Sequence, residues 1–548
     1  MNKVWKRGLS LVLCLALLMT AGCAGGRPLS EEELKAEEEE MALVEKDAMA
    51  AEEGYKEKEE SAPADKKAAA SYPRLILSTV YDSLYHEERG LVSSLEYDQI
   101  ALSGESAEAY PQLAAALAEM SSRAAEQMKE EYESSKETAL ESEEPGGEGS
   151  AMRFESKYSV GRADDRAVSI RSRYVSFTGG AHGFSFTGAE NFDARTGKRL
   201  TLSDISPDPA ALLDRACDSL KKWCEERNVN LFDPDGLRAS VEEMYEEDSL
   251  NWALDPDGIS LLFAPYSIAP YAAGELTARV LFSESPDLFE GDICRQADTW
   301  GMSLFERQSA FADLDGDGSP EEISVDTSRD EYDTVTGICI NIGDEAYTFD
   351  QYGYGLRAFL LHGGEGKTML YADISGDNDY HSLEIFDLTG GEAVRRDTLQ
   401  AGCSVLYDDE TNQAGTCLIT DPSSFILAVR AGDISTYSMS RFCHLGEDGL
   451  PVPETDYYTV VNGGYQFTVL TPFRASTVDP ETEKILEKGV TVKKGEVLTL
   501  VRSNNGSWVE LTAKDGTLYR VEIDSSDWPR TIDGKDISDI FDGLIFAG

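Results

Sequence analysis

Hydrophobic and polar residues alternate along several stretches of the chain, and this period of two is typical of strands with one buried face. The first stretch, YPRLILSTVYDSLYH from Tyr72, is followed by GLVSSLEYDQIAL after the turn sequence EERG. Further strands are expected in MRFESKYSVGRADDRAVSIRSRYVSF from Met152, and in GISLLFAPYSIAP and ELTARVLFS. The order of these segments favours antiparallel pairing.

Two other stretches show the longer period of helices. Their apolar residues recur at steps of three or four, first after Pro111 and then after Pro209: Leu113, Leu117, Met120, Ala124 and Met128, and Leu213, Ala216, Leu220 and Trp223. Each set forms one apolar stripe that faces a core. Asp204 or Asp208 is the acid expected at the start of the second helix. Residues 72–286 therefore predict an α+β module, an antiparallel sheet with two helices.

After residue 286 the pattern changes to short β-type runs separated by Gly and Asp. FADLDGDG from Phe311 and YADISGDN from Tyr371 follow the same order of residue types. Such a repeat suits blade-like or hairpin β units, so residues 287–455 are expected to form a β-rich domain. From residue 456 to 548, alternating strands around a KDG turn predict a small β domain of the SH3-like barrel type.

The first residues have the pattern of an export signal. A basic segment, MNKVWKRG, precedes an apolar run shorter than the roughly 18 residues that cross a bilayer. The sequence TAGC resembles a bacterial lipobox, whose cysteine is acylated and becomes the first mature residue. We therefore expect residues 1–22 to be a lipoprotein signal peptide and Cys23 to be the lipid anchor at the extracytoplasmic face of the cell membrane. Thr20 stands where the lipobox usually has Leu, so ordinary signal-peptidase cleavage is the alternative.

Charge narrows the range of partners. Residues 23–71 are rich in Glu, Lys and Ala, and they predict an acidic, disordered tether because they cannot bury enough apolar surface to offset their ordering entropy. The whole chain has 102 acidic and 49 basic residues, a formal charge of -53. This charge argues against binding to nucleic acid and favours cationic partners such as Ca²⁺ or a basic protein. The alternative explanation of the negative charge is that it keeps the protein soluble.

Common enzyme motifs are missing from the sequence. It has no GxSxG, HExxH or P-loop pattern and no GxGxxG between a strand and a helix, and its five histidines are spread over separate segments. Beyond Cys14 and Cys23, an odd number of cysteines without CxxC spacing argues against a zinc module or a complete disulfide framework. We therefore expect no catalysis.

The sequence DLDGDGSPEE carries the clearest metal-binding pattern. Its aspartates alternate, and its glycines let the backbone bend tightly, so that carboxylates can converge on a hard cation. The twelfth position is Ser324 rather than the Glu of an EF-hand, whereas the ninth is an acid. This arrangement resembles the calcium hairpins of integrin-type FG-GAP propeller repeats. It predicts a structural Ca²⁺ with four ligands: Asp313, Asp315, Asp317 and Glu321. An acidic turn without metal is the alternative.

The second copy of this loop is degenerate. It keeps the polar positions Asp373, Ser375, Asp377 and Asp379, but His381 replaces the acid at the ninth position. Fewer carboxylates weaken cation binding, and whether this copy binds metal stays open.

A glycine loop, GGAHG around His182, is followed by the turn DARTGK, the segment LSD and, about fifty residues later, PYSIAPYAAG. These pieces resemble the paired DUF4163 and DUF3298 modules of bacterial exported proteins, over residues 72–285. The resemblance implies two settings, the lysozyme-binding extracellular part of RsiV-type anti-sigma factors and an accessory module of peptidoglycan deacetylases. This chain lacks a sigma-binding segment and the TFDDG and HxxxH deacetylase motifs, so neither activity is expected of the chain itself.

Together these features predict a non-catalytic, lipid-anchored envelope protein of Gram-positive type. We expect it to bind an extracellular ligand, either a lysozyme-like protein or a cell-wall component such as peptidoglycan. The expected contact residues come from the two matching segments: Gly179, Gly180, His182, Gly183, Tyr266, Pro270 and Tyr271. Packing within the module is the alternative role for the two tyrosines. Three other functions stay open, namely a cell-wall hydrolase that uses His182 with Asp193 or Glu190, a deacetylase accessory protein, and a calcium-stabilised scaffold.

Overall fold

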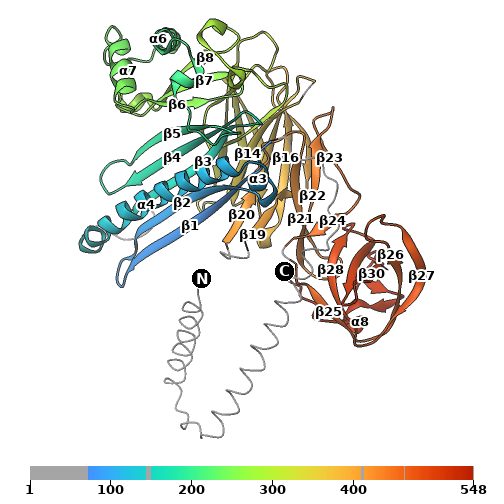
Figure 1. Ribbon diagram of the computed structural model, residues 1–548. Coiled ribbons are helices and arrows are strands. Elements are labelled where there is room, and N and C mark those ends of the chain that lie inside the picture. The colour runs from blue at the N-terminus through green and yellow to red at the C-terminus, as the bar shows by residue number, and fades with distance from the viewer. Residues whose placement is uncertain (1–71, 143–149, 364, 409–412, 462, 547–548) are drawn as a thin grey trace, which may run out of the picture. The chain divides into compact units, whose positions relative to one another are not determined.

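The structure of the chain is a computed structural model that describes residues 72–142, 150–363, 365–408, 413–461 and 463–546 (Figure 1). The expected signal peptide, Cys23 and the tether lie outside the described residues. The described part is mostly β, with several antiparallel sheets and few helices. The more detailed expectations, a propeller of FG-GAP type and an SH3-like barrel, stay predictions, and so does the division into domains.

The first sheet contains the strands expected at the start of the module. Its order is β19, β20, β1, β2, β3, β4, β5. The bounds are β1 (Leu75–His86), β2 (Gly90–Leu102), β3 (Met152–Ala163), β4 (Ala167–Phe177), β5 (Phe184–Asp193), β19 (Val405–Asp408) and β20 (Gln413–Cys417). The last two strands come from far along the chain, and β20 pairs with β1 through Ile76 and Leu77.

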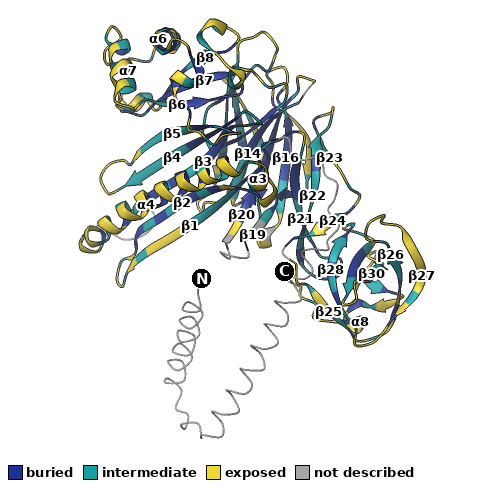
Figure 2. Cartoon of the chain, in the orientation of Figure 1, coloured by how far each residue is buried: buried dark blue, intermediate teal, exposed yellow. Residues whose placement is uncertain are grey.

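Antiparallel pairing was the wrong expectation at one place in this sheet, because β2 and β3 run parallel. The chain between them contains α3 (Gly104–Ala109) and α4 (Pro111–Glu141). A parallel pair needs such a crossover, since a short turn can only join antiparallel strands. The expected helix after Pro111 is confirmed as α4. Its predicted stripe is buried except for the half-buried Ala124, and its opposite face is exposed (Figure 2).

A second, three-stranded sheet packs with the other helices of the module. It consists of β6 (Asn251–Leu254), β7 (Gly258–Phe263) and β8 (Leu276–Leu281), and the helices are α5 (Leu202–Ile205), α6 (Pro209–Arg227) and α7 (Leu237–Glu246). The predicted helix after Pro209 is α6, and Asp208 caps it by accepting from the N–H of Ala211 at 3.0 Å. Asp204 caps α5 instead. The sequence analysis missed α7, whose buried residues are only Leu237 and Val241.

Two further antiparallel sheets share one hydrophobic core. One contains β10 (Ala310–Ala312), β11 (Glu321–Arg329), β12 (Val335–Ile342) and β13 (Glu345–Gly353). The other contains β9 (Trp300–Leu304), β14 (Gly355–His362), β15 (Thr368–Ser375), β16 (His381–Asp387) and β17 (Val394–Leu399). The two repeat copies lie at the β10–β11 and β15–β16 connections, so each is part of a hairpin, as the repeat predicted.

The last strands form one large sheet whose pairing order runs from β18 to β27 without returning to its start. Its first part is β18 (Gly402–Cys403), β21 (Phe425–Ala431), β22 (Tyr437–Leu445), β23 (Pro451–Pro453) and β24 (Tyr458–Val460). Its second part is β25 (Gln466–Val469), β26 (Phe473–Val478), β27 (Ile485–Val492), β28 (Val497–Ser503), β29 (Trp508–Ala513), β30 (Leu518–Glu522) and β33 (Phe541–Asp542). The short elements β31 (Thr531–Ile532), β32 (Lys535–Asp536) and α8 (Ile537–Ile540) lie near the end. Among the helices of the described residues, none is both long and apolar enough to cross a membrane.

Candidate functional site

The glycine loop joins β4 to β5. Gly179 and Gly180 have φ values of +97° and +95°, which L side chains rarely adopt. A Cβ on Gly183 would lie 2.7 Å from the main-chain oxygen of Ser176 across the hairpin. Three positions of GGAHG therefore require glycine for the shape of the loop.

Two distant pieces of the sequence meet at this loop. The ring of His182 stacks on Tyr271, with centroids 4.3 Å apart and planes inclined by 23°. The Tyr271 hydroxyl donates to the main-chain oxygen of Gly183 at 3.3 Å, and His182 Nδ1 lies 3.0 Å from the same oxygen. Tyr271 follows the exposed Pro270 and begins a short 3₁₀ turn. The structure thus brings together the residues that the sequence analysis selected from the two segments.

We call His182, Phe184, Tyr266 and Tyr271 the aromatic surface. Tyr266 is 55% exposed and its ring lies 5.4 Å from that of Tyr271, while Phe184 is 42% exposed. Tyr266 also has a positive φ of 72°, which is uncommon for a non-glycine residue. His182 and Phe184 stand on the β4–β5 hairpin, whose loop shape requires glycine, while Tyr266 and Tyr271 come from the segment between β7 and β8, which the Tyr271 hydroxyl ties to Gly183.

The aromatic surface continues along the hairpin toward α4. Phe186 lies 5.8 Å from Phe184 and 5.4 Å from Tyr174, measured between ring centroids. The Tyr174 hydroxyl donates to Glu131 Oε2 of α4 at 2.5 Å. Burial and this hydrogen bond raise the pKa of Tyr174 to about 12, so the hydroxyl stays a neutral donor at ordinary pH.

The alternative acid–base pair with His182 is not assembled. Asp193 ends the ten-residue strand β5, about 30 Å from the loop at 3.3 Å per residue, and it accepts from Arg195 and Thr196 in its own turn. Glu190 forms ion pairs with Arg123 and Arg199. Neither carboxylate is placed to hold His182 as a general base.

The DLDGDG loop, where the sequence predicts a Ca²⁺, joins β10 to β11. Carboxylate oxygens of Asp313, Asp315 and Asp317 lie within 4.8 Å of one another, and all three residues are exposed. Glu321 does not belong to this group of three; its Oε2 accepts from the N–H of Leu314, the residue after Asp313, at 2.8 Å. Burial and the charges of Asp315 and Asp313 raise the pKa of Glu321. The three converging carboxylates offer only oxygen atoms, the donors that Ca²⁺ prefers, and the four-ligand Ca²⁺ site stays a prediction.

The second loop is closed by an internal pair. Asp373 is 2% exposed and its Oδ1 lies 2.6 Å from His381 Nδ1, while its Oδ2 accepts from the N–H of Cys403 at 3.0 Å. Burial alone would raise the pKa of Asp373, but the hydrogen bond and charge of His381 bring it below the ordinary value. Asp377 accepts from Tyr354 at 2.6 Å, and the side chain of Asp379 lies outside the described residues. The first ligand position of this copy is therefore already occupied.

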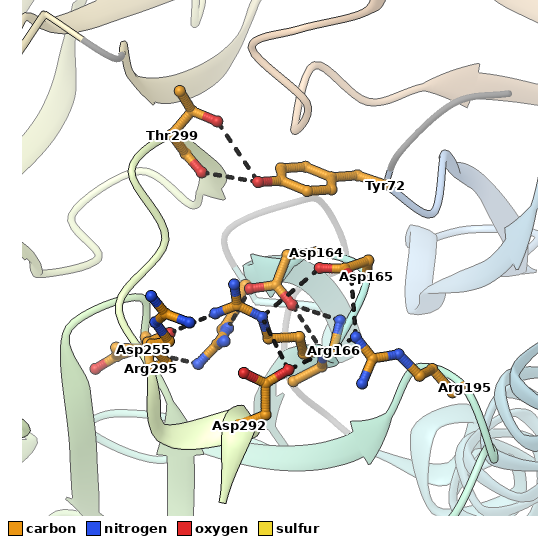
Figure 3. A network of polar contacts seen from close by, with 11 residues as sticks. Tyr72, Asp164, Asp165, Arg166, Arg195, Asp255, Asp292, Arg295 and Thr299 are labelled. Carbon is orange, nitrogen blue, oxygen red and sulfur yellow. Dashed lines mark hydrogen bonds and ion pairs between the residues drawn. The ribbon is translucent and has the colours of Figure 1, made fainter. Parts of the chain in front are cut away.

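A network of arginines and aspartates at the β3–β4 turn was missed by the sequence analysis (Figure 3). Arg162 Nε donates to Asp164 Oδ2 at 2.7 Å, and both side chains are buried. Arg166 Nη1 donates to the main-chain oxygen of Arg295 at 3.0 Å, which ties the turn to the segment after β8. The sequence RADDRA is the only signal, and solvated turns have the same pattern. We assign this network to the fold of the module.

Comparisons with known proteins give two family matches. Residues 209–283 match the family described as "Protein of unknown function (DUF3298)", and residues 105–185 match the family described as "Deacetylase PdaC". No curated protein matches the chain.

Two solved structures are similar to part of the chain. A member of the DUF3298 family from Bacteroides fragilis is 17% identical and covers 41% of this chain and 96% of its own, with a TM-score of 0.30. A DUF3298 family protein from Pseudomonas aeruginosa is 20% identical and covers 40% and 95%, with a TM-score of 0.29. The family matches, over residues 209–283 and 105–185, confirm the DUF3298 and deacetylase-associated parts of the predicted resemblance, while its RsiV-type part stays a prediction.

Proposed function

We propose that residues 72–286 form a non-catalytic binding module of the kind that accompanies deacetylases, and that it holds a cell-wall glycan on the aromatic surface. The exposed ring of His182, stacked on the half-buried Tyr271 beside the exposed Tyr266, is the observation that carries this proposal. Aromatic side chains supply a large contact area with few rotatable bonds, and the flat CH faces of sugar rings pack on them. The PdaC match over residues 105–185, which include His182 and Phe184, supports the same setting.

A second candidate ligand is a basic protein such as lysozyme. The formal charge of -53 favours it, because opposite potentials speed encounter and help to select a partner. Salt distinguishes the two ligands. Binding of a basic protein should weaken steeply with ionic strength, whereas stacking of sugars on the aromatic surface should depend little on it.

The proposal is tested with the full chain, mixed either with insoluble peptidoglycan or with lysozyme, at low and moderate salt. Tyr271→Ala and His182→Ala are expected to weaken peptidoglycan binding by tenfold or more, as aromatic anchors do. Tyr332→Ala is the matched control, because Tyr332 is 80% exposed and lies in the turn between β11 and β12, away from the aromatic surface. Equal retention of all three variants on peptidoglycan would contradict the glycan proposal.

The non-catalytic part needs a separate measurement. Incubation of the chain with peptidoglycan is expected to release neither soluble fragments nor acetate. Release that disappears in the His182→Ala variant would instead support the hydrolase alternative.

The proposed location is the extracytoplasmic face of the membrane, through a lipid on Cys23. Metabolic labelling with a fatty acid should tag the chain and should fail for Cys23→Ala. Labelling that persists in this variant would contradict the anchor.

A further inference from the structure

A cleft of about 590 Å³ lies between the first sheet and the sheet that contains β9, β14 and β15. Neighbouring residues of a strand point to opposite faces of the sheet, so Tyr97 packs with the residues of α4 while the next residue, Asp98, lines the cleft. This volume is within the range of small-molecule sites. The cleft is distinct from the aromatic surface, and binding in it is independent of the function proposed for that surface.

Four carboxylates line the cleft, and each has partners inside the protein. Asp98 accepts from Thr79 Oγ1 at 2.7 Å and from the N–H of Tyr158 at 2.9 Å, and Glu155 lies 3.2 Å from Arg153 Nε. Glu306 accepts from Arg329 at 2.9 Å and from Thr327 at 3.0 Å. Asp373 is bonded to His381 and to the N–H of Cys403. Lys157, which also lines the cleft, is paired with Glu96. The carboxylates of the cleft therefore do not need a cationic ligand as a partner.

Two arginines of the same cleft, in contrast, have few hydrogen-bond partners among the described residues. Arg357 of β14 is half-buried and makes no hydrogen bond or ion pair with any residue that the structure describes; its charge acts on Asp373, which it faces across the β14–β15 pair. Arg173 of β4 donates only from Nη1, to the main-chain oxygen of Glu306 at 3.1 Å. The chain has about two acidic residues for each basic one, so a half-buried guanidinium that is bonded to no carboxylate is unexpected here. Its donors remain available to a ligand.

We propose that this cleft binds a small organic anion, a carboxylate or a phosphate monoester on an apolar body, and that Arg357 and Arg173 hold the anionic group. A guanidinium presents its N–H donors in a planar fork that matches both groups. The apolar body would pack on the wall that Phe305, Leu356 and Val175 contribute. Because each carboxylate of the cleft already has a donor partner, its repulsion of a bound anion is reduced.

Phenyl phosphate and benzoate serve as probes in calorimetric titrations of the full chain, with inorganic phosphate and benzyl alcohol as comparisons. We expect saturable one-to-one binding of at least one of the two organic anions, and the stronger of them identifies the anionic group. Benzyl alcohol, which lacks the charge, and inorganic phosphate, which lacks the apolar body, should bind at least tenfold more weakly.

The variants Arg357→Gln and Arg173→Gln should each weaken binding of the better probe by about tenfold or more, since hydrogen bonds between charged groups are the strong ones. Arg215→Gln is the matched control, because Arg215 pairs with Glu284 outside the cleft and should leave the affinity unchanged. Arg357 has no hydrogen-bonded partner among the described residues to lose, only the attraction of its charge for Asp373, so Arg357→Gln should melt without ligand at close to the temperature of the unmodified chain.

Three results would overturn the proposal. They are the absence of saturable binding for both organic anions, equal affinity of the Arg357→Gln and Arg215→Gln chains, and a clear fall in the melting temperature of ligand-free Arg357→Gln. The last result would assign Arg357 a role in stability instead.

Discussion

At the ninth position of the two repeat loops, a single residue changes what the first aspartate contacts. In the first copy Asp313 lies beside two other exposed aspartates, and its oxygens accept only main-chain N–H groups. In the second copy His381 binds the equivalent residue, Asp373, which is buried. The histidine thus takes the place that a cation would occupy, and the loop closes on an internal pair.

Asp373→Asn should lower the free energy of unfolding by about 3 kcal/mol at pH 7, because it breaks a buried pair. The pKa of Asp373 is lowered in the folded chain, so this contribution is present above the unfolded value near 3.8 and is lost as pH falls through the folded value. Urea unfolding at pH 7 and at pH 3 measures the effect. Asp313→Asn, at the equivalent exposed position, should change stability little in calcium-free buffer. A loss of the same size in both variants would contradict this account.

The stability of the folded chain should also depend on pH through His362. It stacks on Trp300 with ring centroids 5.2 Å apart, and burial lowers its pKa. The unfolded chain therefore binds a proton more readily, and the stability that His362 contributes is complete above about pH 6.5 and is lost as pH falls below it. Between pH 8 and pH 5, a His362→Gln chain should lose less stability than the unmodified chain. Identical stability curves for the two chains between pH 8 and pH 5 would count against the assignment.

At the scale of elements, the period of the hydrophobic residues predicted individual strands and helices, but it did not predict how the strands pair. The stripe after Pro111 located α4, and alternation located β1 to β4. The period does not show the direction in which a strand runs, so the parallel pair of β2 and β3 was missed. Helix α7 was missed because two buried residues are too few to set a period. His182, Tyr266 and Tyr271 of the aromatic surface were selected from the GGAHG and PYSIAPYAAG motifs, and Phe184 was not. Their ring contacts depend on folding that no local pattern encodes.

Asn191 illustrates a contact between elements that the sequence does not reveal. It is 2% exposed, its Nδ2 donates to the main-chain oxygen of Trp252, and its Oδ1 accepts from the N–H of Leu254, both at 2.8 Å. The amide therefore links β5 to β6 as a neighbouring strand would.

Asn191→Ala leaves two buried main-chain groups without their partner, so it should lower the free energy of unfolding by about 2–4 kcal/mol. Asn341→Ala is the control, because that half-buried amide bonds to side chains and to no main-chain group: it donates to Ser324 at 3.1 Å and accepts the weak bond of the Cys339 thiol at 3.7 Å, so its loss should cost about 1 kcal/mol or less. Chemical denaturation of both variants gives the comparison. Equal losses would mean that the link between β5 and β6 contributes nothing of its own.

At the scale of the whole molecule, a single core contains residues from the start of the described chain and from the sheets that follow residue 286. Leu75, Ile100 and Leu113 belong to the same buried cluster as Phe359 and Cys443. Sequence patterns mark where composition changes, for example after residue 286, but they do not show whether the two sides share a core. This explains why the module could be recognised by its motifs while its packing against the later sheets could not be predicted.

The calcium loop is a proposal that the stability of the whole molecule can test. If the converging aspartates bind Ca²⁺, the ion stabilises the folded chain by about 2.7 kcal/mol when its concentration is a hundred times the dissociation constant. Thermal melts should therefore rise with Ca²⁺ and fall with chelator, and Asp315→Asn should remove most of the difference. Asp377→Asn, in the closed second loop, should keep it. Equal melting temperatures with Ca²⁺ and with chelator would contradict the proposal.

The hairpin of β19 and β20 also bears on how the chain reaches its native state. Residues Ile76 and Leu77 pair with Cys417 and Thr416, so this edge of the first sheet stays open until more than three hundred further residues have been synthesised. An open strand edge is a site of wrong association, and pairing over so long a separation is slow. During its synthesis the chain must therefore keep the outer edge of β1 from joining other strands until its own distant hairpin arrives.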